Sequence, residues 1–317
     1  MAVVITGTGS VTAPSLDALP EAVRARATRA ERVSQLALAA ADAALLDAGL
    51  HLVDGEPRAG IGVVLGTAFG CFLTNAAYQH RVATGGPAAA SPRLFAATVS
   101  NAAAGEVGVA YRLGGPAVTL TAGAAAGLTA LGHAADLLRA GQAGALVAGG
   151  ADAVDAALVA WQQAGGLEPG RRPAEAAALL VLERDDAAAG RGARVRGTIL
   201  AHAAGFEPEP GAVDAGEGLT GAIAAAVAEA DLAPSEIAAV VLGAPPALAP
   251  LETRALAGLA GAARIAPKDT FGETFGAAGP LGVIAGLAAV KPGCAILVLD
   301  VCASGHVAAL VARRGGA

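Results

Sequence analysis

The sequence predicts an α/β protein in which a strand-and-helix unit occurs twice. Three observations lead to this prediction. Short β-branched or aliphatic runs alternate with longer Ala-rich stretches of helical periodicity. Two helices rich in Ala and Gly, near residues 124–138 and 276–290, occupy comparable places in the two halves. Apolar residues make up 55% of the chain and charged residues 15%, which is typical of a compact, extensively buried fold.

In the first half, residues 2–5 are expected to form a buried strand, which ends at Thr6-Gly7-Thr8-Gly9. Residues 13–30 mix charged residues with prolines, which favours a loop or a short helix. Apolar residues at 3.6 spacing predict a helix over residues 29–50, with Gly49 at its end. The other elements expected here are strands at 61–65, 118–121, 145–148 and 176–183, a helix ending near residue 80, loops at 84–92 and 164–175, and helix or loop over 95–109.

In the second half, the same reading predicts strands at 194–202, 238–242, 295–301 and 306–311, and helices at 218–230, 251–259 and 272–290. Strands that alternate with helices predict parallel sheets covered on both faces. No extended linker separates the halves. We therefore expect one domain over residues 1–317, with pseudo-repeat halves at approximately 1–190 and 191–317 and the two Ala/Gly-rich helices packed together at the centre.

Composition excludes several classes of protein. A net charge of −6 without a basic block argues against nucleic acid or an anionic membrane as the main partner. No stretch is apolar enough for a membrane span, and the first residues, MAVVITG, form a strand with no signal peptide before them. Three scattered cysteines favour a reducing cytoplasm. Neither metal-ligand spacing nor a phosphate loop is present, so we expect no metal and no cofactor.

The chain is organised around residues 115–138, GPAVTLTAGAAAGLTALGHAADLL. A β-branched run turns through Thr121-Ala122-Gly123-Ala124 into the first Ala/Gly-rich helix. Enzymes of the α/β class often place a nucleophile at such a turn, because the free N–H groups and the helix dipole favour negative charge there. This turn holds no Cys, no Ser and no acid. The sequence thus predicts the frame of a covalent catalyst without its reactive group.

Several motifs resemble the beta-ketoacyl-ACP synthases of the thiolase fold over nearly the whole chain. The resemblance implies a thiolase-like fold, in which duplicated βαβαβ halves form a five-layered αβαβα arrangement. The chain is shorter than a typical member, mainly before Arg29 and around residues 165–180. Besides the stretch at 115–138, the segments that carry the resemblance are VVITGTGSVTA (3–13), LALAAADAALLDAGL (36–50), GVVLGTAFG (62–70), NAAAGEVGVAYRLGGP (101–116), LVAGGAD (146–152) and KDTFGETFGAAG (268–279).

The resemblance also implies where catalytic groups would lie. The family uses a Cys nucleophile, which falls at Ala124, and two His residues, which fall at Glu273 and just after the strand ending near Val241. An Ala has no lone pair to attack a thioester, and an ionised Glu273 would repel an oxyanion. Near Val241 the motif is lost, although Glu252 remains, and the Gly-rich loop at 301–305 is changed too. We therefore expect no catalytic residue at these degenerate positions.

A subclass with this pattern is the chain length factor, the beta subunit of type II polyketide and polyene synthases. The resemblance implies a subunit that forms a heterodimer with an active ketosynthase through residues 118–121, shapes the acyl tunnel and meets acyl carrier protein mainly through its partner. The subclass often has Gln where this chain has Ala124, which argues against decarboxylation by this chain. Product, chain length and type of pathway stay open. So do two alternatives: a divergent acyl-transfer enzyme using Cys302 or Glu273, and a homodimeric scaffold.

Several candidate residues have two interpretations. Glu273 is either functional or a structural acid, and in both cases a buried carboxylate needs a partner such as Lys268. Phe95, Thr98 and Val99 align with the segment that reaches the subunit interface and closes the tunnel in chain length factors. Alternatively, Phe95 belongs to an ordinary core.

Other polar groups are assigned structural roles. Cys302 and His306 are four residues apart, but a loop between strands does not bring such residues together as a helix would, so we expect no catalytic pair there. His133 is expected to be packed or at an interface. Arg24, Arg26, Arg29 and Arg32 are expected to form a solvated face, with contact to an acidic carrier protein as the alternative.

Overall fold

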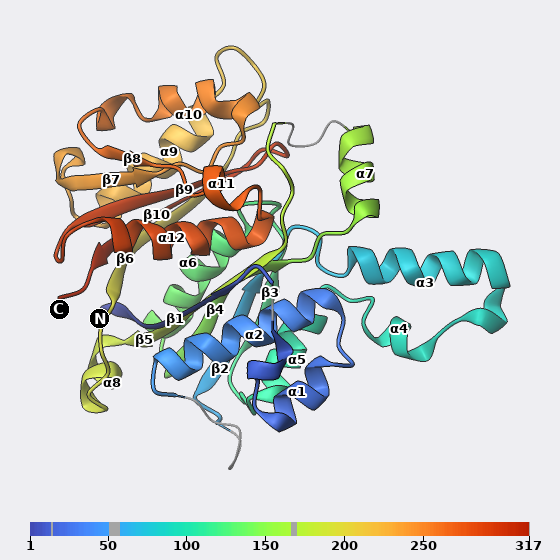
Figure 1. The fold of residues 1–317 in the computed structure, drawn as a ribbon. Coiled ribbons are helices and arrows are strands. Elements are labelled where there is room, and N and C mark those ends of the chain that lie inside the picture. The colour runs from blue at the N-terminus through green and yellow to red at the C-terminus, as the bar shows by residue number, and fades with distance from the viewer. Residues whose placement is uncertain (14, 51–57, 166–169, 317) are drawn as a thin grey trace.

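The structure, a computed structural model, describes residues 1–13, 15–50, 58–165 and 170–316. Its strands form a ten-stranded sheet (Figure 1). Part of the loop expected at 164–175 therefore lies outside the described residues. The strand order is β3-β2-β4-β5-β1-β6-β10-β9-β7-β8. The strands are β1 (Val3–Val11), β2 (Ile61–Gly66), β3 (Ala117–Leu120), β4 (Ala145–Asp152), β5 (Ala176–Arg184), β6 (Gly197–Phe206), β7 (Ile237–Val241), β8 (Ala263–Ile265), β9 (Ala295–Val301) and β10 (His306–Arg314).

The two halves of this sheet have the same topology. From the junction between β1 and β6 outward, one side has the order β1-β5-β4-β2-β3 and the other β6-β10-β9-β7-β8. The first two pairs on each side are antiparallel and the last two are parallel. At the junction, residues 3–5 pair antiparallel with residues 197–199. The division of the chain at residues 190 and 191 stays a prediction.

The expectation of parallel sheets is wrong for the middle of the sheet. β5 runs antiparallel to β4 and β1, and β10 runs antiparallel to β9 and β6. The reason is clearest at β10, which follows β9 after only residues 302–305. A parallel crossover requires about a dozen residues or more, so a connection this short returns the chain in the opposite direction.

Most expected helices are confirmed, with shifted ends. The helix expected over 272–290 begins only at residue 278, because positive φ angles at Gly272 and Phe275 interrupt it. The sequence did not predict β8 or the helices α7 and α8, since three to ten residues with few buried side chains leave little pattern. The helices are α1 (Glu21–Ala27), α2 (Arg32–Asp47), α3 (Phe72–Gly85), α4 (Pro92–Ala96), α5 (Ala102–Ala110), α6 (Ala126–Arg139), α7 (Ala156–Gly165), α8 (Asp185–Gly190), α9 (Glu217–Glu229), α10 (Ala249–Ala255), α11 (Lys268–Phe271) and α12 (Ala278–Ala289).

Alternate side chains of each strand enter different cores, and this divides the fold into five layers. In β4, Val147 packs against α1, α2 and α5 on the outside of the first half, whereas Leu146 faces α6. In β9, Leu297 packs against α9 and α10, and Val298 faces the central core with α12. The central helices α6 and α12 thus lie between the two halves of the sheet, and the outer helices cover it (Figure 1). The expected αβαβα arrangement is confirmed.

The close packing of α6 and α12 depends on glycine. A Cβ atom on Gly127 of α6 would overlap the carbonyl oxygen of Gly276 and the ring of Pro280. A Cβ atom on Gly279 of α12 would lie 2.7 Å from the Cβ atom of Leu128. The expectation that the two Ala/Gly-rich helices pack against each other is therefore confirmed, and their composition follows from this approach.

Two features of the first half face away from the core. β3 is the end strand of the sheet and pairs with β2 alone among the described strands. Helices α3 and α4, with the turn between them, form an arm that extends from the body (Figure 1). Along α3 only Thr74 is buried, so the arm has almost no core of its own.

Candidate functional site

The turn between β3 and α6 places Ala124 in the interior. Its side chain is 1% exposed. Gly123 before it has φ +56°, a left-handed conformation that glycine adopts without strain. A Cβ atom on Gly123 would collide with Sγ of Cys302, so the sulfur lies directly against this turn. The position at which the family's nucleophile is expected thus has a methyl group, and the thiol that lies against the turn belongs to Cys302, the residue after β9.

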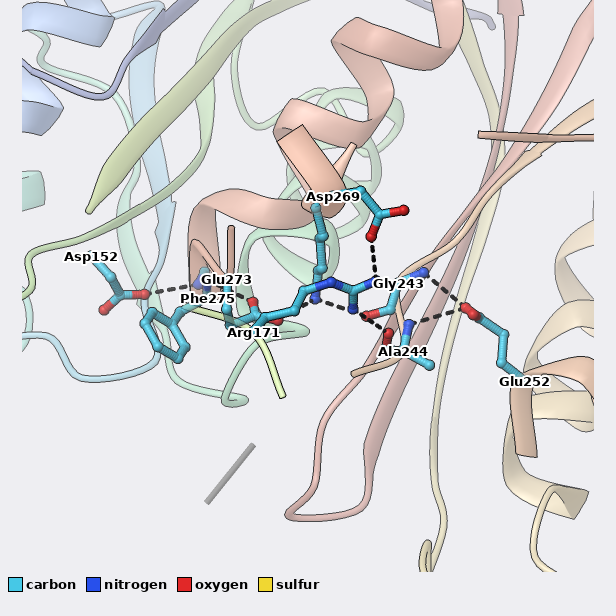
Figure 2. Close-up of polar contacts among 10 residues, drawn as sticks. Asp152, Arg171, Gly243, Ala244, Glu252, Asp269, Glu273 and Phe275 are labelled. Carbon is cyan, nitrogen blue, oxygen red and sulfur yellow. Dashed lines mark hydrogen bonds and ion pairs between the residues drawn. The ribbon is translucent and has the colours of Figure 1, made fainter. Parts of the chain in front are cut away.

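Glu273 is part of a buried charge network (Figure 2). Its side chain is 2% exposed, and Oε2 lies 3.0 Å from Nζ of Lys268, which is 6% exposed. Nζ of Lys268 also donates to the carbonyl oxygen of Gly243 at 2.7 Å, and the amide of Phe275 donates to Oε1 of Glu273 at 3.0 Å. The predicted pair with Lys268 is confirmed, whereas the choice between a structural and a functional role for Glu273 stays a prediction.

Glu252 holds the segment that follows β7, where the other family His would lie. Val241 ends β7, and the chain continues through Gly243 and Ala244. Their amides donate to Oε1 of Glu252 at 2.8 and 3.1 Å, and Arg171 donates to the carbonyl oxygen of Ala244 at 2.8 Å (Figure 2). Burial raises the pKa of the Glu252 carboxyl, while these amides and the charges of Lys268 and Arg171 oppose the shift.

Replacing Glu252 with glutamine is expected to change how stability depends on pH. Because the pKa of Glu252 is raised in the folded state, its contribution to stability is complete below the unfolded pKa of about 4.3 and declines as the pH rises through the folded value. A glutamine side chain does not titrate and keeps an oxygen for the two amides. The free energy of unfolding of Glu252→Gln, relative to the parent protein, should therefore rise between acidic and neutral pH. Urea unfolding at several pH values measures this difference, and a difference independent of pH contradicts the assignment.

Asp152 joins the first half to the segment before α12. It is fully buried at the end of β4 and accepts hydrogen bonds from Oγ1 of Thr67 at 2.7 Å and from the amides of Ala68, Phe69 and Gly276 at 2.8–2.9 Å. Burial raises its pKa, and these four donors oppose the shift. The run Gly149-Gly150-Ala151-Asp152 indicated an acid at the end of this strand, but no local pattern indicated that Thr67 and Gly276 are its partners.

The hairpin between β9 and β10 brings together side chains that we expected to be apart. Sγ of Cys302 lies 3.0 Å from Oγ of Ser304, which lies 3.2 Å from Nδ1 of His306. The loop thus links Cys302 to His306 through Ser304, and the expectation that they form no catalytic pair stays a prediction. It considered helical spacing, whereas a tight hairpin turns the chain back on itself, so that Cys302 and His306 lie opposite each other and the amide of Cys302 donates to the carbonyl oxygen of His306 at 2.9 Å. The missed signal was Ser304 between them.

The three residues expected at the tunnel or interface lie at the base of the arm. Phe95, at the end of α4, is 62% exposed and packs on Tyr78 of α3, with ring centroids 5.8 Å apart. Val99 is 50% exposed, and the carbonyl oxygen of Thr98 accepts hydrogen bonds from Cys71 and Asn75. The alternative that Phe95 belongs to an ordinary core is wrong. A role in a tunnel or interface stays a prediction.

The clustered arginines of the first half are partly paired. Arg26 forms an ion pair with Glu106, and Arg32 with Glu175. Arg26 and Arg29 also border a groove between α1, α4 and α5. Within the part of the chain that the structure describes, no three or more acidic, Cys or His side chains are arranged to hold a metal ion, and no helix is sufficiently long and apolar to cross a membrane.

The strand order, the central helix pair and the buried turn at Ala124 define the class of protein as a thiolase-like ketosynthase fold. Residues 6–188 match the sequence model of the family "Beta-ketoacyl synthase, N-terminal domain". A "Putative polyketide beta-ketoacyl synthase 2" of Streptomyces coelicolor is 33% identical over 306 residues, which cover 86% of this chain and 70% of the relative. The chain belongs to the beta-ketoacyl synthase family.

Two further proteins are similar to this chain. The "Tetracenomycin polyketide synthase ketoacyl synthase beta subunit" of Streptomyces glaucescens is 30% identical over 285 residues, covering 82% of this chain and 69% of the relative. The solved structure of "The ishigamide ketosynthase/chain length factor" superposes with a TM-score of 0.83 at 25% identity and covers both chains completely. The expected resemblance to the chain length factor branch of the family is confirmed.

Proposed function

We propose that this chain is a non-catalytic, ketosynthase-like subunit of the chain length factor type. It pairs with an active beta-ketoacyl synthase in type II polyketide or polyene biosynthesis and shapes the tunnel for the growing acyl chain. The observation that supports this most directly is the buried methyl group of Ala124 where the family's nucleophile would stand. The Lys268–Glu273 pair and the segment after β7 supply no imidazole in place of the family's two His residues.

The proposed interface is the edge of β3 together with the arm of α3 and α4. An end strand leaves a row of main-chain donors and acceptors free for a further strand. The arm exposes the apolar side chain of Phe95, and Val99, three residues after α4, is exposed as well. Interface cores are enriched in aromatic side chains of this kind. The partner supplies the catalytic Cys and His groups and most of the surface that docks acyl carrier protein, in a reducing cytoplasm that suits three cysteines without a disulfide.

Co-expression with an active ketosynthase tests this function. We expect the two chains to co-purify in a 1:1 ratio and to elute together in size-exclusion chromatography. The pair should condense acyl and malonyl carrier thioesters, whereas this chain alone should not. Condensation by the isolated chain would overturn the proposal in favour of an independent enzyme. Elution as a homodimer that does not bind the ketosynthase would favour the scaffold alternative.

Phe95→Ala tests the tunnel wall and the interface together. Burying a Phe side chain is worth about 1.5–3 kcal/mol, so its loss should weaken the heterodimer by about tenfold or more if Phe95 lies in the interface. If Phe95 also closes the tunnel, the product should grow by at least one two-carbon unit, because volume is freed. Binding titrations and product mass measure the two effects. Leu46→Ala, at a 63% exposed position on α2, is the matched control and should change neither.

A further inference from the structure

Cys302, Ser304 and His306 form a chain of three polar side chains on one face of the β9–β10 hairpin. The two links, thiol to hydroxyl and hydroxyl to imidazole, measure 3.0 and 3.2 Å. Main-chain hydrogen bonds hold the hairpin closed, since the amide of Cys302 donates to the carbonyl oxygen of His306 and the amide of Gly305 donates to that of Cys302, both at 2.9 Å. The three groups are therefore held in register by the backbone.

The thiol end of this chain lies against the turn that leads into α6. Sγ of Cys302 contacts Gly123, the residue before Ala124, and α6 begins three residues after Gly123. A helix N-terminus favours negative charge and therefore a thiolate. The sulfur thus lies on the hairpin that faces the turn at which the family's Cys is expected.

The imidazole end reaches the surface. Cys302 is 5% exposed, but Ser304 and His306 are both exposed. The ring of Phe206, itself 54% exposed, packs edge-on against His306 with centroids 5.5 Å apart. An apolar ring beside an exposed base is a suitable contact for the acyl chain of a thioester that approaches the thiol.

We propose that Cys302 accepts an acyl group from an acyl thioester, with Ser304 and His306 as the proton relay. The thiol proton passes to Oγ of Ser304 as the Ser304 proton passes to Nδ1 of His306. The sulfur then attacks the thioester carbonyl, a new C–S bond forms, and the old C–S bond breaks. The departing thiolate takes the proton back from His306 through the relay and leaves as a free thiol. This exchange goes beyond the proposed function, in which the chain catalyses no condensation, because acylation of Cys302 forms no carbon–carbon bond and needs neither decarboxylation nor a group at Ala124.

Incubation of the full-length chain with hexanoyl-N-acetylcysteamine tests the site. Intact-mass spectrometry should show a gain of one hexanoyl group, and peptide mapping should place it on Cys302. Ser304→Ala and His306→Gln should each slow acylation at least tenfold, because general-base assistance is worth about 100-fold or more. Both are surface positions, so these variants test the relay even if Cys302→Ala fails to fold.

Cys294 is the matched control, since it too forms no disulfide and it lies outside the relay. Cys294→Ala should be acylated at the parent rate. An acyl group found on Cys71 or Cys294, no acylation at all, or equal rates in Ser304→Ala and the parent would each overturn the proposal. Pairing with the ketosynthase is assayed separately, by co-purification of Ser304→Ala. Failure of acylation with retained pairing therefore leaves the proposed function intact.

Discussion

Replacing Lys268 with methionine is expected to lower the free energy of unfolding by about 3–5 kcal/mol, because it leaves the buried carboxylate of Glu273 without its cation. It also removes the donor to the carbonyl oxygen of Gly243. Both effects act between α11 and the segment after β7, so the loss should appear in global unfolding. The urea midpoint followed by far-UV circular dichroism measures it.

Two variants make this result specific. Lys291, the other lysine of the chain, is exposed, so Lys291→Met should change stability by no more than about 0.5 kcal/mol. Lys268→Met combined with Glu273→Gln removes the unpaired charge and keeps an oxygen for the amide of Phe275, so it should recover most of the loss. If the double variant is no more stable than Lys268→Met, an unpaired Glu273 is not the cause.

Gly127→Ala should lower stability by about 2–3 kcal/mol although alanine is the better helix former. The added methyl group would overlap the carbonyl oxygen of Gly276 and the ring of Pro280, and neither can rotate away. Helices α6 and α12 would have to separate, and the segment around Gly276 would shift with them. Thermal unfolding of the purified variant measures the effect.

Gly105→Ala is the matched control for this substitution. Gly105 lies within α5, and a Cβ atom added there meets no atom within 4 Å. The same change should therefore stabilise the protein by about 0.5–1 kcal/mol through helix propensity and lower entropy of the unfolded chain. The two variants differ only in what surrounds the new methyl group. Destabilisation by both would show that the α6–α12 contact is not the cause.

Much of the fold could be predicted from the sequence because it follows from local pattern. The β-branched run before residue 121 and the Ala/Gly-rich helix after it are local signals, and both are confirmed. The antiparallel centre was missed because strand direction depends on how the chain returns, and the pattern within a strand does not record that. The continuity of the two halves through β1 and β6 was not predicted either, since only residues 3–5 and 197–199 make the junction.

The site was predicted less completely. The missing nucleophile at Ala124 and the Lys268–Glu273 pair could be read from one motif each, because their positions are fixed by near neighbours in sequence. The contact between Cys302 and Gly123 could not be predicted from the sequence, since 179 positions separate the two residues and only the packing of the halves brings them together. The exposure of Phe95 could not be predicted either, because the sequence of a short helix does not show whether another element covers an apolar residue on it.

The two ends of the sheet are unequal, and this limits how copies can assemble. β8 has three residues and carries an exposed Arg264, whose guanidinium donates to the carbonyl oxygens of Leu259 and Ala262. A short, charged margin resists the addition of another strand, whereas β3 has no charged residue. A strand from another chain can therefore pair with β3 more readily than with β8. With the proposed interface at β3, the chain joins one neighbour and no more, which gives a closed pair and no filament.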